Sequence, residues 1–128
     1  AGAVSDRSGR DPLTLMAGLL CLGAVGHLLL TSGAPLAAAI GAPIALGLGW
    51  GWPGLFHDHV SGLGVGAGPA TGYSMIGLSL GGATGPLLIG GVMDVLGTAA
   101  GWGATGGLAV TAAGLTLVAR RGGGSRRP

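Results

Sequence analysis

Residues 13–30 read LTLMAGLLCLGAVGHLLL, an apolar run without Asp, Glu, Lys or Arg. About 20 consecutive apolar residues in an α-helix cross the hydrocarbon core of a bilayer, which is roughly 30 Å thick. A backbone in lipid has no water to bond, so such a run is expected to form a helix that satisfies its own polar groups. We therefore predict a transmembrane helix over residues 13–31.

Three further apolar runs of similar length follow, separated by short polar or glycine-rich breaks. We predict that they form transmembrane helices over residues 34–56, 70–93 and 99–119. The runs do not alternate apolar with polar residues, which argues against the strands of a membrane β-barrel. The sequence thus predicts an all-α membrane protein with four transmembrane helices, a cytoplasmic loop at 1–12 and a cytoplasmic tail at 120–128.

The composition agrees with a membrane location. Of the 128 residues, 48% are hydrophobic and 8% are charged, whereas soluble domains usually carry about 25% charged residues. The 31 glycines and 7 prolines would suit a disordered chain, but disorder requires low hydrophobicity and high net charge. Cys21 is the single cysteine, so neither an intrachain disulfide nor a multi-cysteine metal site is expected.

The basic residues indicate the orientation of the helices. Four helices place both ends of the chain on one side of the membrane, and cytoplasmic flanks carry an excess of basic residues. We therefore expect a cytoplasmic C-terminus, with the connections Thr31–Gly33 and Asp94–Thr98 on the opposite side. Nucleic-acid binding is not expected, because it requires a basic face and not two terminal clusters. All six basic residues lie near the ends of the chain: Arg7, Arg10, Arg120, Arg121, Arg126 and Arg127.

The sequence contains no recognisable enzymatic arrangement of residues. It has no Ser–His–Asp or Cys–His pattern and no phosphate-binding loop, so we do not expect an enzyme or a cofactor. His57-Asp58-His59 lacks the third or fourth ligand that a metal site needs, and a solvated loop end explains it. His27 is an ionisable residue inside a predicted helix, which makes proton coupling a hypothesis for it.

Glycine and proline spacing predicts how the helices meet. Gly77, Gly81 and Gly85 lie four residues apart, a pattern that clears one face of a helix for close packing. Prolines inside the predicted helices remove backbone donors and should bend or loosen the helices at Pro43, Pro53 and Pro86. The same glycine spacing recurs at Gly47 and Gly51 and at Gly103 and Gly107.

A motif precedes the first predicted helix. Residues 2–11 read GAVSDRSGRD, which resembles the signature cytoplasmic loop of the major facilitator superfamily of transporters. Gly9 permits a tight turn, and Asp6 and Arg7 can pair with helix ends or with charges on the cytoplasmic face. The residues that carry the resemblance are Gly2, Asp6, Arg7, Gly9 and Arg10.

The resemblance implies a twelve-helix fold in which this loop occurs twice, so the chain corresponds to helices three to six or nine to twelve. Residues 47–54, GLGWGWPG, resemble helix ten, and the second predicted helix lacks the arginine that helix four of the family often has. Residues 81–91 resemble helix eleven, which favours helices nine to twelve. They also resemble the glycine–proline motif of antiporter members but depart from it by one residue. Because the chain begins with Ala, we expect the earlier helices to be missing and this fragment to be inactive alone.

The resemblance also implies alternating access, in which two six-helix bundles rock about a central site to move a small solute. The expected partners are the lipid bilayer, the remainder of the transporter and a small-molecule substrate, and the expected location is the plasma membrane. Tryptophans near helix ends can alternatively anchor at the membrane interface, and serine or threonine hydroxyls can bond carbonyls of their own helix. The candidate cavity-lining residues are Trp50, Trp52, Tyr73, Ser74, Ser79 and Thr84.

Two alternatives to a transporter fragment remain. The chain could be a non-transporting helical membrane module or a truncated remnant, and a transport assay on the isolated chain would separate these from a transporter. It could also be a complete four-helix exporter resembling the small multidrug resistance family. That family depends on a membrane-embedded Glu in its first helix, and this chain contains no Glu.

Overall fold

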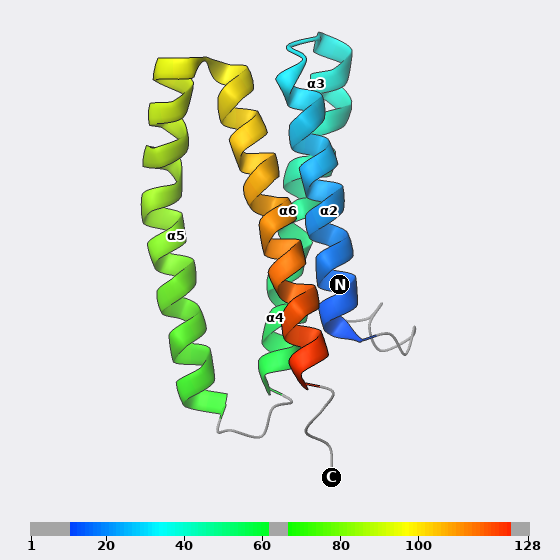
Figure 1. Ribbon diagram of the computed structural model, residues 1–128, viewed down its shortest axis with the longest axis vertical. Coiled ribbons are helices and arrows are strands. Elements are labelled where there is room, and N and C mark those ends of the chain that lie inside the picture. The colour runs from blue at the N-terminus through cyan, green and yellow to red at the C-terminus, as the bar shows by residue number, and fades with distance from the viewer. Residues whose placement is uncertain (1–10, 62–66, 124–128) are drawn as a thin grey trace.

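The computed structural model describes residues 11–61 and 67–123, and Figure 1 shows their arrangement in helices. Within these ranges, four helices are long and apolar enough to cross a membrane, which confirms the predicted helical class. The second of them is composite, because four elements follow one another directly from Pro35 to Ser61; we call it the composite helix. In chain order the elements are α2 (Pro12–Thr31), α3 (Pro35–Ala42), the π-helix η1 (Pro43–Leu48), the 3-10 helix η2 (Gly49–Gly51), α4 (Trp52–Ser61), α5 (Ala67–Leu96) and α6 (Thr98–Gly123).

Proline and glycine mark where the helices begin and turn. Pro12 and Pro35 stand in the first turn of their helices, where no backbone donor is needed. Gly33 and Gly97 have φ angles of 67° and 89°, and no other described residue has a positive φ. Glycine adopts this conformation at no steric cost. Gly97 alone joins α5 to α6, so these two helices form a tight antiparallel hairpin (Figure 1).

Helix α2 is the centre of the bundle. It packs along α6 and along all four elements of the composite helix, whereas α5 contacts α6 and α4. The buried cluster is small and consists of Ala17, Leu20 and Ala113. In Figure 1, α5 stands at the edge of the bundle, on the far side of α6 from α2.

Most of the large apolar side chains point outward. Leu36, Leu87 and Val95 are 74%, 77% and 81% exposed. A monomeric soluble protein rarely exposes contiguous apolar surface of this extent. The outward faces therefore match a lipid environment, in agreement with four membrane-crossing helices.

Glycines bring α2 and the composite helix into close contact. A Cβ atom on Gly23 would lie 2.8 Å from the Cα of Gly49, and one on Gly41 would lie 2.8 Å from the carbonyl oxygen of Gly26. Because real Cβ atoms do not approach so closely, these positions require glycine for the observed crossing. Close approach of backbones is how small residues serve packing between membrane helices.

The glycine repeat predicted to pack is not the one that makes this contact. A Cβ on Gly77, Gly81 or Gly85 would meet no atom within 4 Å among the described residues. These glycines lie on α5, which contributes little to the buried core. Their spacing leaves an open face on α5. That these glycines serve helix packing therefore stays a prediction, which would need a partner other than the described helices.

The prolines act in three different ways. At Pro43 the chain changes from α-helix to π-helix, and a 3-10 turn follows, which confirms the predicted loosening there. Pro53 lies at the second residue of α4, a position where proline is tolerated. Helix α5 continues through Pro86 as one element.

Several helices extend beyond the predicted ends. Helix α4 extends past residue 56, where the predicted second transmembrane helix ends, through Ser61, and it contains His57, Asp58 and His59. Val60 in this extension is buried. Its packing stabilises the last turns of α4, which the polar residues had led us to predict as a loop. Helix α6 likewise continues past Arg120, since cations are favourable near a helix C-terminus.

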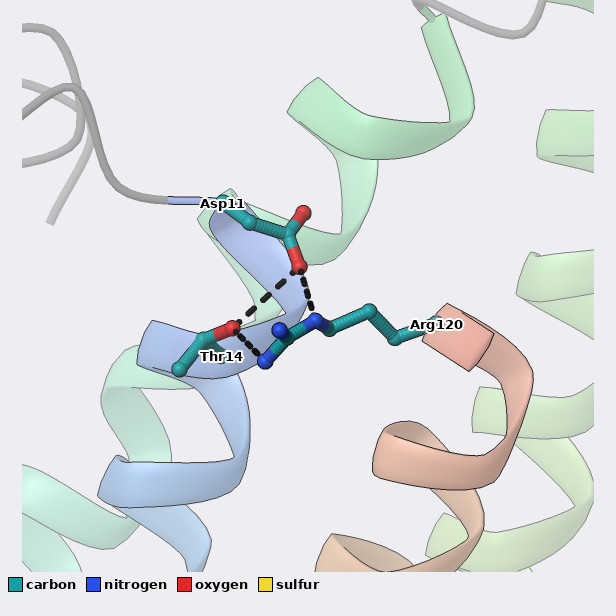
Figure 2. A network of polar contacts seen from close by, with 3 residues as sticks. All are labelled: Asp11, Thr14 and Arg120. Atoms are coloured by element: carbon teal, nitrogen blue, oxygen red, sulfur yellow. Dashed lines mark hydrogen bonds and ion pairs between the residues drawn. The ribbon is translucent and has the colours of Figure 1, made fainter. Parts of the chain in front are cut away.

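A polar network joins the first turn of α2 to the last turns of α6, as Figure 2 shows. The Nη1 of Arg120 donates to the Thr14 hydroxyl at 2.8 Å, and its Nε lies 3.4 Å from the Asp11 carboxylate. The Thr14 hydroxyl in turn donates to Asp11 at 3.2 Å. The two described ends of the chain therefore lie at the same end of the bundle, as an even number of antiparallel helices requires.

Candidate functional site

Two adjoining cavities lie between the composite helix and α5. The first, of about 320 Å³, is nearer the end of the bundle where α4 ends and α5 begins; the second, of about 540 Å³, extends toward the middle of α5. Both are lined by Trp52, Gly77 and Leu78, so they form one continuous depression, which we call the α5 trough. Its remaining lining residues are Met16, Trp50, Pro53, Phe56, His57, Tyr73, Ser74, Gly81, Gly82 and Pro86.

Aromatic side chains form the wall on the composite helix. Trp50 lies on η2 and Trp52 opens α4. Residues two apart do not share a face on a regular α-helix, yet both tryptophans line the larger cavity at the change from 3-10 to α geometry. Trp52 meets Phe56 edge to face, with ring centroids 6.1 Å apart. This wall therefore presents indole and phenyl rings along about two turns.

The opposite wall is largely bare backbone. Gly77, Gly81 and Gly82 line the trough from α5, and a Cβ atom added to any of them would meet no other atom within 4 Å. Tyr73 and Ser74 lie one turn earlier and line the smaller cavity. Polar side chains thus gather at one end of the trough, where His57 faces Tyr73 and Ser74 across it.

The trough collects most of the predicted cavity residues. Trp50, Trp52, Tyr73 and Ser74 all line it. Ser79 and Thr84 do not, and the Thr84 hydroxyl donates to the Leu80 carbonyl at 2.7 Å. The alternative role of a hydroxyl bonded within its own helix therefore holds for Thr84.

Sequence reasoning missed Phe56 and His57. Phe56 lies four residues after Trp52, so both fall on one face of a helix, a signal that the sequence carries. This spacing lies inside the predicted helix 34–56 and was overlooked, whereas the predicted end at residue 56 placed His57 in a loop. The longer helix α4 brings both residues into the trough.

His27 has partners within the bundle. Its Nδ1 lies 2.7 Å from the Gly23 carbonyl oxygen, and its ring lies 5.9 Å from the Trp102 ring on α6. These contacts orient the imidazole at the interface of α2 and α6. Neither His27 nor Trp102 lines the trough.

A third cavity, of about 450 Å³, lies between α2 and the composite helix. The described residues that line it are all leucine or glycine, so they offer no polar side chain to orient a ligand. Ligand sites usually combine an apolar lining with a few placed polar groups. The α5 trough is therefore the better candidate.

The loop motif lies outside the described residues, so nothing is placed for Gly2, Asp6, Arg7, Gly9 and Arg10. Comparison with models of protein families, with curated proteins and with solved structures found no match. The class that the fold itself defines is an all-helical protein with four helices able to cross a membrane.

Proposed function

We propose that this chain forms part of a secondary transporter and that the α5 trough belongs to the path of its solute. The observation that carries the proposal is the trough itself, which combines an aromatic wall, a bare glycine wall and a polar end. Substrate sites of secondary transporters lie between helices near the middle of the membrane. The larger cavity extends along α5 from Gly77 to Pro86, about the middle of that helix.

The peripheral place of α5 supports the same proposal. Its glycine face is open, and its main contacts are with α6 and α4. Alternating access requires elements whose packing can change as the cavity opens to either side. A helix with few buried contacts moves at low cost.

The loop resemblance adds the family to this proposal. We take the chain to correspond to helices nine to twelve of a transporter resembling the major facilitator superfamily, with a cytoplasmic C-terminus in the plasma membrane. The faces of α5 that do not line the trough would then meet further helices of the transporter. A small solute and the lipid bilayer would be its other partners.

Water accessibility of the trough tests this function. With Cys21 replaced by Ser, Gly81→Cys places a thiol in the trough near the middle of α5, and Gly107→Cys places one near the middle of α6. Both glycines have open space around them, but Gly107 does not line the trough. In proteoliposomes, a charged thiol reagent that cannot cross lipid should label Gly81→Cys and leave Gly107→Cys unlabelled.

Equal labelling of the two variants, or labelling of neither, would contradict a solute path through the trough. A chain that served as a non-transporting helical module would give such a result. Circular dichroism of both variants should match the parent chain, which establishes that the helices are intact.

A further inference from the structure

The lining of the α5 trough also bears on what it binds. Among the described residues, none that lines its two cavities is Asp, Glu, Lys or Arg. Asp58 on α4 and Asp94 on α5, the carboxylates of the two helices that form the walls, lie outside the lining. An ion moved from water into such a site loses hydration without gaining a countercharge, which is costly at membrane depth. The trough therefore favours an uncharged ligand.

The two long walls define the shape of that ligand. Trp50 and Trp52 present indole rings from the composite helix, and Gly77, Gly81 and Gly82 present backbone without side chains from α5. A flat molecule can stack its face on an indole and lie against bare backbone. Aromatic stacking of this kind adds to the gain from burying apolar area. A branched or bulky body would contact the glycine wall poorly.

Polarity changes along the trough. His57, Tyr73 and Ser74 line the smaller cavity, near the end of the bundle, whereas the larger cavity is lined by Trp, Gly, Leu and Pro. A ligand that follows this change has an apolar body and one hydrogen-bonding group at its end. The two volumes, about 320 and 540 Å³, lie in the range of small-molecule sites.

From these features we infer that the α5 trough binds an uncharged, flat amphiphile. Its ring system lies between the tryptophans and the glycine wall, and its polar group points to His57 and Ser74. This inference rests on the proposed function, because it names the substrate class of the same site.

Matched probes test the substrate class. Three probes share one flat ring system and differ in charge: 1-pyrenemethanol is neutral, 1-pyrenesulfonate is anionic and 1-pyrenemethylammonium is cationic. Binding to the full chain in lipid nanodiscs is measured by equilibrium dialysis against empty nanodiscs, which removes simple partitioning into lipid. We expect saturable binding of the neutral probe, about tenfold tighter than that of either ion.

A larger side chain on the glycine wall of the α5 trough provides the matched variant. Gly81→Leu should weaken binding of 1-pyrenemethanol about tenfold, because the leucine occupies the space of the ring system. Gly107→Leu introduces the same side chain on α6, in open space and away from the trough, and should leave binding unchanged. Matching circular dichroism of the two variants would confirm that both fold.

An acyl chain is the competing occupant, and a second measurement distinguishes it. In a Trp102→Phe background, the remaining tryptophans are Trp50 and Trp52, and phospholipid with brominated chains quenches those that it touches. Saturating 1-pyrenemethanol should raise the ratio of tryptophan emission in brominated lipid to that in unbrominated lipid in the parent chain but not in Gly81→Leu, and the ratio cancels energy transfer from tryptophan to pyrene. If the probe does not relieve quenching by the brominated chains in the parent chain, lipid fills the α5 trough and the inference is overturned.

Tighter binding of an ionic probe, or equal binding to the two leucine variants, would also overturn it. These outcomes are separate from failure of the solute path. If Gly81→Cys is labelled by the aqueous reagent but the neutral probe does not bind, the path stands and the substrate class is wrong.

Discussion

Glycine has two distinct uses in this chain. At Gly23, Gly26, Gly41 and Gly49 the absence of a side chain permits backbone contact between α2 and the composite helix. At Gly81 and its neighbours on α5 the same absence leaves open space. The two groups are the same residue type in different surroundings. A larger side chain should therefore destabilise the bundle at the first group and be tolerated at the second.

Gly26→Leu should destabilise the bundle by about 1–3 kcal/mol or more, because the added side chain meets backbone that cannot move aside. A Cβ at this position would already collide with the backbone at Ala45 and Gly41. Gly107→Leu is the matched control, since its Cβ would meet no atom within 4 Å. Unfolding in mixed micelles with increasing dodecyl sulfate, followed by circular dichroism, gives both free energies.

Equal stability of the two leucine variants would contradict the crossing of α2 and the composite helix at these glycines. A modest gain in stability for Gly107→Leu is compatible with it, because leucine favours helix more than glycine does.

The network of Asp11, Thr14 and Arg120 links α2 and α6 at one end of the bundle. The side chains of Arg120 and Asp11 are 51% and 39% exposed, so solvent screens their attraction. Exposed ion pairs contribute little to stability, typically about 0.2–1 kcal/mol. The network therefore contributes little to the stability of the α2–α6 contact.

A double-mutant cycle of Asp11→Asn and Arg120→Gln should give a coupling free energy of about 0.5 kcal/mol. In 1 M salt the coupling should decrease, because exposed charges are screened within about 3 Å. The same cycle with Arg121→Gln, at the next residue of α6, serves as the control and should give a smaller coupling. A coupling free energy above about 1 kcal/mol that does not change with salt would contradict an exposed pair.

The whole molecule is an antiparallel set of four helices with both described ends at one end (Figure 1). The connections on the opposite end are tight turns at Gly33 and Gly97. All six arginines flank the chain ends, and basic residues favour the cytoplasmic side. From these two facts together we expect both ends of the chain on the cytoplasmic side.

Single cysteines should report this topology. In a Cys21→Ser background, Arg121→Cys should react with an impermeant thiol reagent from the cytoplasmic side and Ser32→Cys from the opposite side. Labelling of intact cells and of inverted vesicles gives the two accessibilities. Reaction of both cysteines from the same side would be incompatible with four membrane crossings.

The helices themselves were predictable from the sequence, because hydropathy and the need to satisfy backbone groups in lipid act locally along the chain. The turns at Gly33 and Gly97 and the change of helix type at Pro43 follow from residue type in the same way. Of the trough, Trp50, Trp52, Tyr73 and Ser74 came from the family resemblance, and nothing local placed them opposite one another.

The tertiary structure decided which faces meet. Whether a glycine packs, as Gly26 does, or lies open, as Gly81 does, depends on the helix that passes beside it and not on its own neighbours in sequence. For the same reason Asp11 and Arg120 were paired, and His57 entered the trough, only once the helices were in place. Contact between distant residues is a property of packing, since the same spacing of small residues fits several different crossings.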